Sequence, residues 1–137
     1  MTKIVINTCF GGFGLSPLAV KEYLKLKGKE CYFYIRKDFN SPLLKCDIIH
    51  ILPSSNIYFF TKDHGDLVTE FTDEDVISIY DISRDDPDLV TVIESLNKTA
   101  NGVFANLKVV EIPDDVAWEI DNHQGIESIE EVHRSWV

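Results

Sequence analysis

Residues 4–17, IVINTCFGGFGLSP, contain the pattern that decides the fold at the start of the chain. The β-branched run over residues 3–9 predicts a buried strand. Three glycines (Gly11, Gly12 and Gly14) follow within four residues, and Ser16-Pro17 is typical of a helix N-cap and first position. A strand, a glycine turn and a helix N-terminus together favour a concave patch of backbone N–H groups that would bind an anion.

This glycine loop differs from the common nucleotide-binding loops. It lacks the lysine of a P-loop, which argues against ATP hydrolysis, and its spacing is not GxGxxG. We expect the glycine amides and the Ser16 hydroxyl to hold a phosphate or carboxylate, with Phe10 or Phe13 stacked on a base or sugar. The alternative is a tight strand-to-helix turn with both phenylalanines in the core.

Length and composition indicate one globular domain over residues 1–137. Apolar residues make up 45% and charged residues 26% of the chain. No 18-residue apolar run predicts a membrane span, and the N-terminus is not typical of a secretory signal, so we expect a cytoplasmic protein. The net charge of −10 argues against direct binding to nucleic acids or acidic membranes and is compatible with a basic protein partner.

Cysteines and histidines give no sign of a metal site or a cofactor. Cys9, Cys31 and Cys46 have no CxxC spacing, and the four histidines lack ligand spacing. We therefore expect reduced, buried thiols. The alternative for Cys9 is a thiolate made reactive by the nearby helix N-terminus.

The remaining periodicity predicts an α/β or α+β fold, a single domain with a mixed sheet and about three helices packed on it. The strand–helix–strand start favours a parallel first pair with a right-handed crossover. The expected helices cover residues 17–27, 87–96 and 126–136, with a short helical piece at 43–46. The expected strands cover residues 3–9, 30–36, 47–52, 57–61, 67–71, 76–82, 107–112 and 116–120.

A second cluster, residues 81–87 (DISRDDP), again joins a strand end to a helix start. If strands 3–9 and 76–82 were neighbours, both loops would face one crevice. Arg84 would then grip an anion, while Asp81 and Asp85 would hold a ribose hydroxyl or a metal. The alternative is that Arg84 pairs with Asp85 or Asp88 and that Asp86 only caps the helix.

A third cluster lies at the end of the chain. His133 or Arg134 would reach the ligand crevice from the last predicted helix, and Trp136 would form a stacking wall. The alternative is that these side chains pack on the sheet and complement the helix dipole. The catalytic residues stay unknown, because Ser16 lies in no GxSxG elbow and nothing selects a carboxylate pair.

Several sequence blocks look familiar together: KIVIN at residues 3–7, GGFGLS at 11–16, SRDDPDLV at 83–90, KVVEIPDD at 108–115 and HRSW at 133–136. The chain resembles a family of small uncharacterised proteins of tailed bacteriophages and prophages. The resemblance leaves residues 38–75 unaccounted for. It implies a viral accessory protein in the bacterial cytoplasm and, by analogy with other small phage proteins, a role against host defence.

Three functions remain open from the sequence. The first is capture of a small anionic ligand, such as a nucleotide immune signal, by the glycine loop with Arg84. The second is an acidic protein inhibitor or nucleic-acid mimic, with its acids clustered on one face. The third is a small hydrolase or transferase acting on a nucleotide or sugar, with a carboxylate or histidine near the glycine loop. A homo-oligomer would suit a ligand trap.

Overall fold

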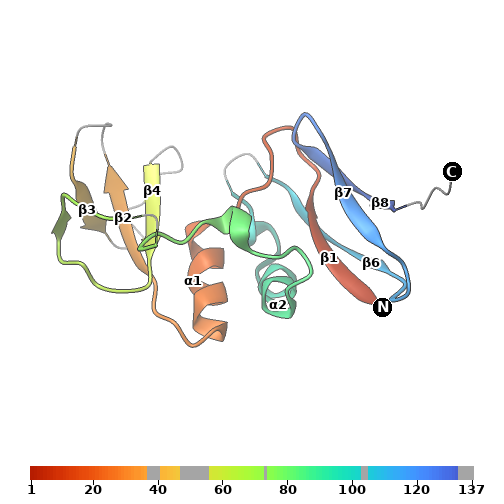
Figure 1. Cartoon of the computed structure of the whole chain (residues 1–137), viewed down its shortest axis with the longest axis horizontal. Coiled ribbons are helices and arrows are strands. Elements are labelled where there is room, and N and C mark those ends of the chain that lie inside the picture. Colours follow the sequence, from red (N-terminus) through yellow and green to blue (C-terminus); the bar gives the residue numbers. More distant parts are fainter. Residues whose placement is uncertain (37–40, 47–55, 73, 103–104, 133–137) are drawn as a thin grey trace, which may run out of the picture.

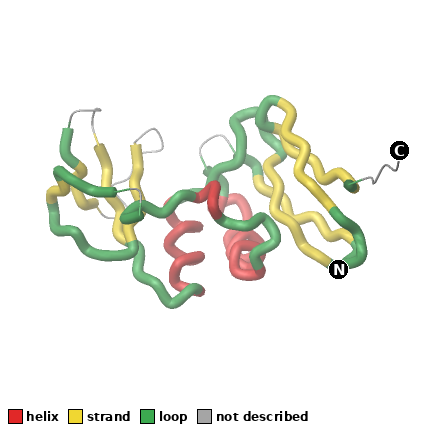
Figure 2. Tube along the Cα trace, viewed as in Figure 1, coloured by secondary structure: helices red, strands yellow, loops and turns green. Residues whose placement is uncertain are grey.

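The protein is seen here as a computed structural model, which describes residues 1–36, 41–46, 56–72, 74–102 and 105–132. Three parts follow one another along the long axis (Figures 1 and 2). An antiparallel sheet forms one end, two helices form the middle, and two strand pairs form the other end. The fold is therefore mixed α+β with antiparallel sheets.

The sheet at the first end has four strands in the order β4-β2-β3-β5, and all neighbours run antiparallel. Aromatic side chains explain why these segments are strands, because they pack across a pleated surface. Tyr34 and Phe60 are fully buried there, with their ring centroids 4.7 Å apart. The bounds are β2 (Tyr32–Arg36), β3 (Leu43–Cys46), β4 (Asn56–Phe60) and β5 (Leu67–Val68).

At the other end, two antiparallel pairs lie against each other. Val5 of β1 pairs with Val109 of β6. A hairpin joins β7 to β8 through Gln124 and Gly125, whose φ angles are 56° and 93°. Two residues with positive φ are typical of the tight hairpin turn that matches strand twist. The bounds are β1 (Thr2–Asn7), β6 (Leu107–Ile112), β7 (Trp118–His123) and β8 (Ile126–Glu131).

The helices α1 (Pro17–Leu26) and α2 (Pro87–Leu96) begin as expected from their caps. The Ser16 hydroxyl accepts a hydrogen bond from Ala19 N at 3.2 Å, and Asp86 Oδ1 accepts one from Asp88 N at 2.9 Å. Both helices contribute to the main core, in which Val20 and Leu89 are fully buried. Two 3₁₀ turns flank α2, namely η2 (Ile79–Asp81) and η3 (Asn97–Ala100). No helix of the described residues has the length and apolar character needed to cross a membrane.

Two expectations about topology were wrong. The first strand does not begin a parallel crossover, because β1 pairs antiparallel with β6 and β2 belongs to another sheet. Residues 126–131 form strand β8 rather than a third α-helix, so the described residues contain two α-helices. The positive-φ turn at Gln124 and Gly125 returns the chain onto β7, and cross-strand pairing outweighs the helical spacing of the isoleucines.

Local expectations had mixed outcomes. The piece 43–46 is a strand, not a helix, because it pairs with both β2 and β5. Residues 76–82 are not a strand: Val76 makes a single bridge to Phe60, and the chain then turns into η2. The expected strands at 57–61 and 107–112 are confirmed as β4 and β6, whereas 47–52 lies outside the described residues.

Candidate functional site

The glycine loop is covered on two sides. A Cβ on Gly125 of the hairpin turn would lie 2.2 Å from Phe10 O, and one on Gly102 would lie 2.8 Å from the carbonyl carbon of Gly14. These two glycines therefore let other backbone segments touch the loop directly. The expected open hollow at residues 11–16 is not formed on these sides.

Several groups expected to hold an anion are already bonded within the fold. The Ser16 hydroxyl donates to Thr99 O at 2.6 Å, and Ser16 N donates to Ala100 O at 2.9 Å. Gly12 N lies 3.4 Å from its acceptor, Cys9 O, and the φ of Gly12 is 88°. The geometry is that of the alternative, a tight strand-to-helix turn, although only one of its phenylalanines is in the core: Phe13 is 7% exposed and Phe10 is 70% exposed.

Arg84 is engaged by a partner that the sequence did not suggest. Its guanidinium binds Glu127 of β8 through two parallel hydrogen bonds of 2.6 and 2.8 Å. It also donates to Val5 O at 3.2 Å and lies 3.6 Å from the centroid of the Phe13 ring. Neither Asp85 nor Asp88 is its partner, and its charge is balanced inside the protein.

Asn7 links the same region into one buried network. Its side-chain amide nitrogen donates to Cys9 O and Gly125 O at 2.6 and 2.7 Å, and its amide oxygen accepts from Asn106 N at 2.8 Å. Its backbone N donates to Glu127 Oε1 at 2.8 Å. We call Asn7, Arg84 and Glu127 the buried clasp, because they fix the hairpin on β1 and on the glycine loop.

The third predicted cluster, His133, Arg134 and Trp136, lies outside the described residues. Across the part of the chain that the structure describes, no group of histidines, cysteines and carboxylates is arranged to hold a metal ion.

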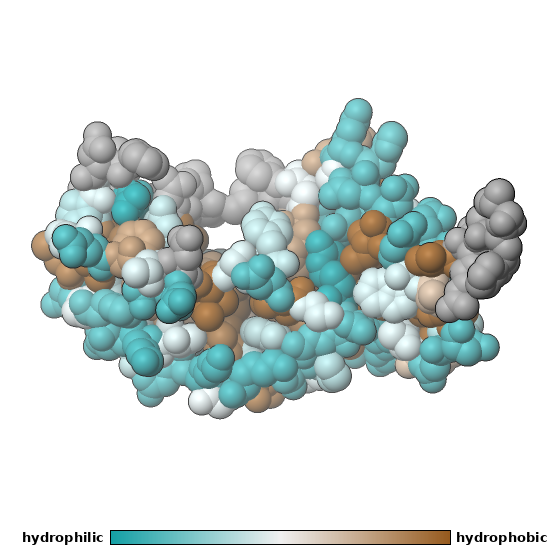
Figure 3. All heavy atoms as spheres, viewed as in Figure 1, coloured by the Kyte–Doolittle hydropathy of each residue, from teal (hydrophilic) through white to brown (hydrophobic). Residues whose placement is uncertain are grey.

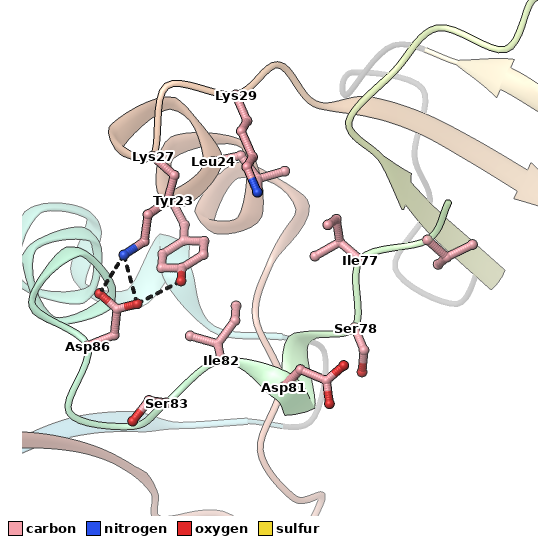
Figure 4. A pocket seen from close by; sticks show the side chains of 11 residues that line it. Tyr23, Leu24, Lys27, Lys29, Ile77, Ser78, Asp81, Ile82, Ser83 and Asp86 are labelled. Carbon is pink, nitrogen blue, oxygen red and sulfur yellow. Dashed lines mark hydrogen bonds and ion pairs between the residues drawn. The ribbon is translucent and has the colours of Figure 1, made fainter. Parts of the chain in front are cut away.

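A hollow of about 460 Å³ lies between α1 and the connector that runs from Val76 to Asp86 (Figure 4). Leu24, Ile77 and Ile82 extend into it from both sides. Apolar atoms are visible in this middle part of the molecule (Figure 3). We call this space the apolar hollow; its size is within the usual range for small-molecule sites.

One wall of the apolar hollow is held by three polar groups. The Tyr23 hydroxyl donates to Asp86 Oδ2 at 2.7 Å, and Lys27 Nζ lies 3.1 Å from the same oxygen (Figure 4). Lys27 Nζ also lies 2.9 Å from Asp88 Oδ2. Burial, followed by the bond to Asp86, raises the pKa of Tyr23 to about 12. Burial opposes ionisation of Asp86, but the bonds from Tyr23 and Lys27 outweigh it and lower the pKa of that carboxyl. The polar groups of this wall therefore bind one another rather than a ligand.

A second hollow, of about 380 Å³, lies between α1 and the start of β2. Three lysine side chains contribute to its lining, and we call it the lysine hollow. Lys29 lines both hollows, so the two adjoin at this residue. Its lining residues are Lys21, Lys25, Lys29, Glu30, Cys31 and Tyr32.

Among the described residues, the lining of the lysine hollow contains more positive than negative side chains. Within the described residues, Lys21, Lys25 and Lys29 take part in no salt bridge. Glu30 is the one carboxylate that the described residues contribute to the lining, and it accepts a hydrogen bond from the Tyr32 hydroxyl. Other lysines differ: Lys3, Lys27 and Lys45 each lie within 3.2 Å of a carboxylate oxygen.

The thiol in the lysine hollow is not poised for catalysis. Burial raises the pKa of Cys31 to about 12, against a weaker opposing effect of Lys21. A thiol with this pKa stays protonated near neutral pH and is a poor nucleophile. The lysine hollow therefore offers positive charge and hydrogen-bond donors rather than a reactive sulfur.

No family model matches the chain, and no curated protein or solved structure is significantly similar to it. The resemblance to phage proteins stays a prediction. The lysine hollow was not predicted, although Lys21, Lys25 and Lys29 recur every four residues in the sequence. Asn7 and Glu127 were not predicted either. Asn7 ends an apolar strand, Glu127 lies in a segment that was expected to be helical, and neither position gave a local signal of pairing.

Proposed function

We propose that the protein captures a small anionic ligand, and that the lysine hollow, not the glycine loop, holds the anion. One observation carries the proposal: Lys21, Lys25 and Lys29 surround one hollow without a salt-bridge partner in the described part of the chain. The chain has 23 acidic and 13 basic residues, so carboxylates are plentiful. Three neighbouring lysines that form no salt bridge with the acids of the described residues favour a site for an external anion.

The repulsion between neighbouring lysines also favours binding of an anion. Lys21 and Lys25 are one helical turn apart, and like charges at this spacing cost about 0.2–0.5 kcal/mol. A phosphate or carboxylate between the ammonium groups would remove this repulsion and accept charge-assisted hydrogen bonds.

Binding alone would suffice for the role suggested by the resemblance, a phage accessory protein that sequesters a nucleotide immune signal. A trap needs affinity and no reactive group. The protonated Cys31 thiol and the mutually bonded Tyr23, Lys27 and Asp86 are in keeping with a binding protein rather than a hydrolase.

Isothermal titration calorimetry with inorganic pyrophosphate tests this proposal. Wild-type protein should bind, and the Lys21→Gln/Lys25→Gln variant should bind at least about tenfold more weakly, because two charge-assisted contacts are lost. Lys98→Gln removes an exposed lysine of η3 and is the matched control, expected to bind like wild type. Undiminished affinity in the double variant, or no binding by wild type, would refute the proposal.

A second function is favoured by the charge of the C-terminal strands. Residues 105–132 contain eight carboxylates and one lysine. Glu119 and Glu130 are exposed and directly opposite each other on β7 and β8, with Asp121 on the same face. Like charges in this position destabilise a hairpin, so their presence is compatible with a basic protein partner, as the inhibitor alternative supposes.

Charge reversal separates the two functions. We expect Glu119→Lys/Glu130→Lys to abolish capture of a basic host protein in a cross-linking assay and to leave pyrophosphate binding intact. The Lys21→Gln/Lys25→Gln variant should show the opposite pattern. If capture of the protein persists after charge reversal, the acidic face is not its binding surface.

A further inference from the structure

We infer, on the basis of the proposed function, that the anion is the phosphate of a nucleotide whose base lies in the apolar hollow and donates hydrogen bonds to Asp81. The phosphate would lie among the ammonium groups of the lysine hollow. Lys29, which lines both hollows, would contact the ligand where it passes from one to the other.

The two hollows differ in the part of a ligand that they suit. The lysine hollow provides three cations for an anionic group. The apolar hollow provides Leu24, Ile77 and Ile82, which are 2% exposed, half-buried and 9% exposed, respectively. Leu24 and Ile82 form the buried base of this hollow, and Ile77 is the one of the three that still presents partly exposed apolar surface. A planar ring would cover that surface, whereas an anion with no organic part would not.

The outer rim of the apolar hollow has the opposite charge to its Lys29 end. Ser78 and Asp81 lie close together there, at the two ends of the η2 turn (Figure 4). The Ser78 hydroxyl oxygen accepts from Tyr80 N at 3.3 Å, which leaves its own proton available to a ligand. Among the described residues, the exposed Asp81 carboxylate takes part in no salt bridge or side-chain hydrogen bond shown by the structure.

This polarity fixes the direction of the ligand. A carboxylate repels phosphate and accepts N–H donors, so the anionic end belongs at Lys29 and a donor-bearing edge belongs at Asp81. The wall of Tyr23, Lys27 and Asp86 does not compete for either end, because these three residues satisfy one another. Guanine presents two neighbouring N–H donors on one edge, which match both oxygens of a single carboxylate.

Calorimetric titration of the whole chain with GMP, AMP, ribose 5-phosphate and pyrophosphate tests the inference. GMP should bind about tenfold or more tightly than ribose 5-phosphate, which keeps the phosphate and sugar but lacks the base. Asp81→Asn should weaken GMP by about tenfold and leave ribose 5-phosphate unchanged. Asp115→Asn, on an exposed turn in the C-terminal part, is the matched control and should bind like wild type.

Two of the possible outcomes overturn the inference and leave the proposed function standing, and a third overturns both. If ribose 5-phosphate and pyrophosphate bind as tightly as GMP, the base does not use the apolar hollow, and capture of an anion stands without it. If GMP binds tightly but Asp81→Asn has no effect, the assigned direction of the base is overturned. If none of the four ligands binds, both the inference and the proposed function are refuted.

Discussion

Removal of the Glu127 carboxylate should destabilise the protein more than any other single truncation on the hairpin. Glu127 is 6% exposed, and the substitution Glu127→Ala leaves two groups without their partner. The Arg84 guanidinium loses bonds of 2.6 and 2.8 Å, and Asn7 N loses one of 2.8 Å. The Arg84 side chain is only 18% exposed, so water replaces these bonds poorly.

The expected loss follows from the cost of leaving a buried charge unpaired. Breaking one side of a buried ion pair costs about 3–5 kcal/mol, which is a large part of a typical domain stability of about 5–15 kcal/mol. For a chain of this size, 1 kcal/mol corresponds to about 3 °C in Tm. We therefore expect Glu127→Ala to lower Tm by about 9–15 °C.

The assay is urea unfolding with thermal melting of the same samples. Glu130→Ala is the matched control, because Glu130 is exposed on the same strand and lies opposite Glu119. We expect the control to change Tm by less than about 2 °C, as surface substitutions usually do. Equal melting of Glu127→Ala and Glu130→Ala would refute the idea that the buried clasp holds the hairpin.

Three further predictions concern other contacts. Gly125→Ala should lower the free energy of unfolding, measured with urea, more than Gly28→Ala does. Both residues have positive φ, but only at Gly125 would the added Cβ lie 2.2 Å from a backbone oxygen. Equal losses of stability would contradict this close approach. Tyr23→Phe should cost about 1.5 kcal/mol at neutral pH. The pKa of Tyr23 in the folded protein is about 12, above its usual 10.0. The difference in the free energy of unfolding between wild type and Tyr23→Phe should therefore be full below pH 10 and shrink from pH 10 to 12. A difference that grows with pH would contradict this. Glu130→Lys should raise Tm slightly by pairing with Glu119, and a lower Tm would show that the acids do not repel each other.

Local signals predicted α1 and α2, whereas the helical expectations at 43–46 and 126–131 were wrong. Ser16-Pro17 and Asp86-Pro87 each satisfy a helix N-terminus with groups near in sequence, so both starts could be predicted from residues within one turn. Strands β4 and β6 were also predicted, because their apolar runs are short and bounded by polar or proline-containing turns.

The pairing of residues that lie far apart in the sequence could not be predicted. Val5 pairs with Val109, and Arg84 pairs with Glu127, across separations that no local pattern encodes. The glycine loop illustrates the same limit: its residues are compatible with an anion cradle, but Gly102 and Gly125 admit other segments onto it. That Lys21, Lys25 and Lys29 form no salt bridge with any described acid could be seen only in the structure.

The most direct test of the central claim is a ¹H–¹⁵N NMR titration of the whole chain with inorganic pyrophosphate. If the lysine hollow captures anions, the largest amide shifts should fall on residues 21–32, and they should disappear in Lys21→Gln/Lys25→Gln. Shifts centred on residues 10–16, or none at millimolar pyrophosphate, would contradict the account.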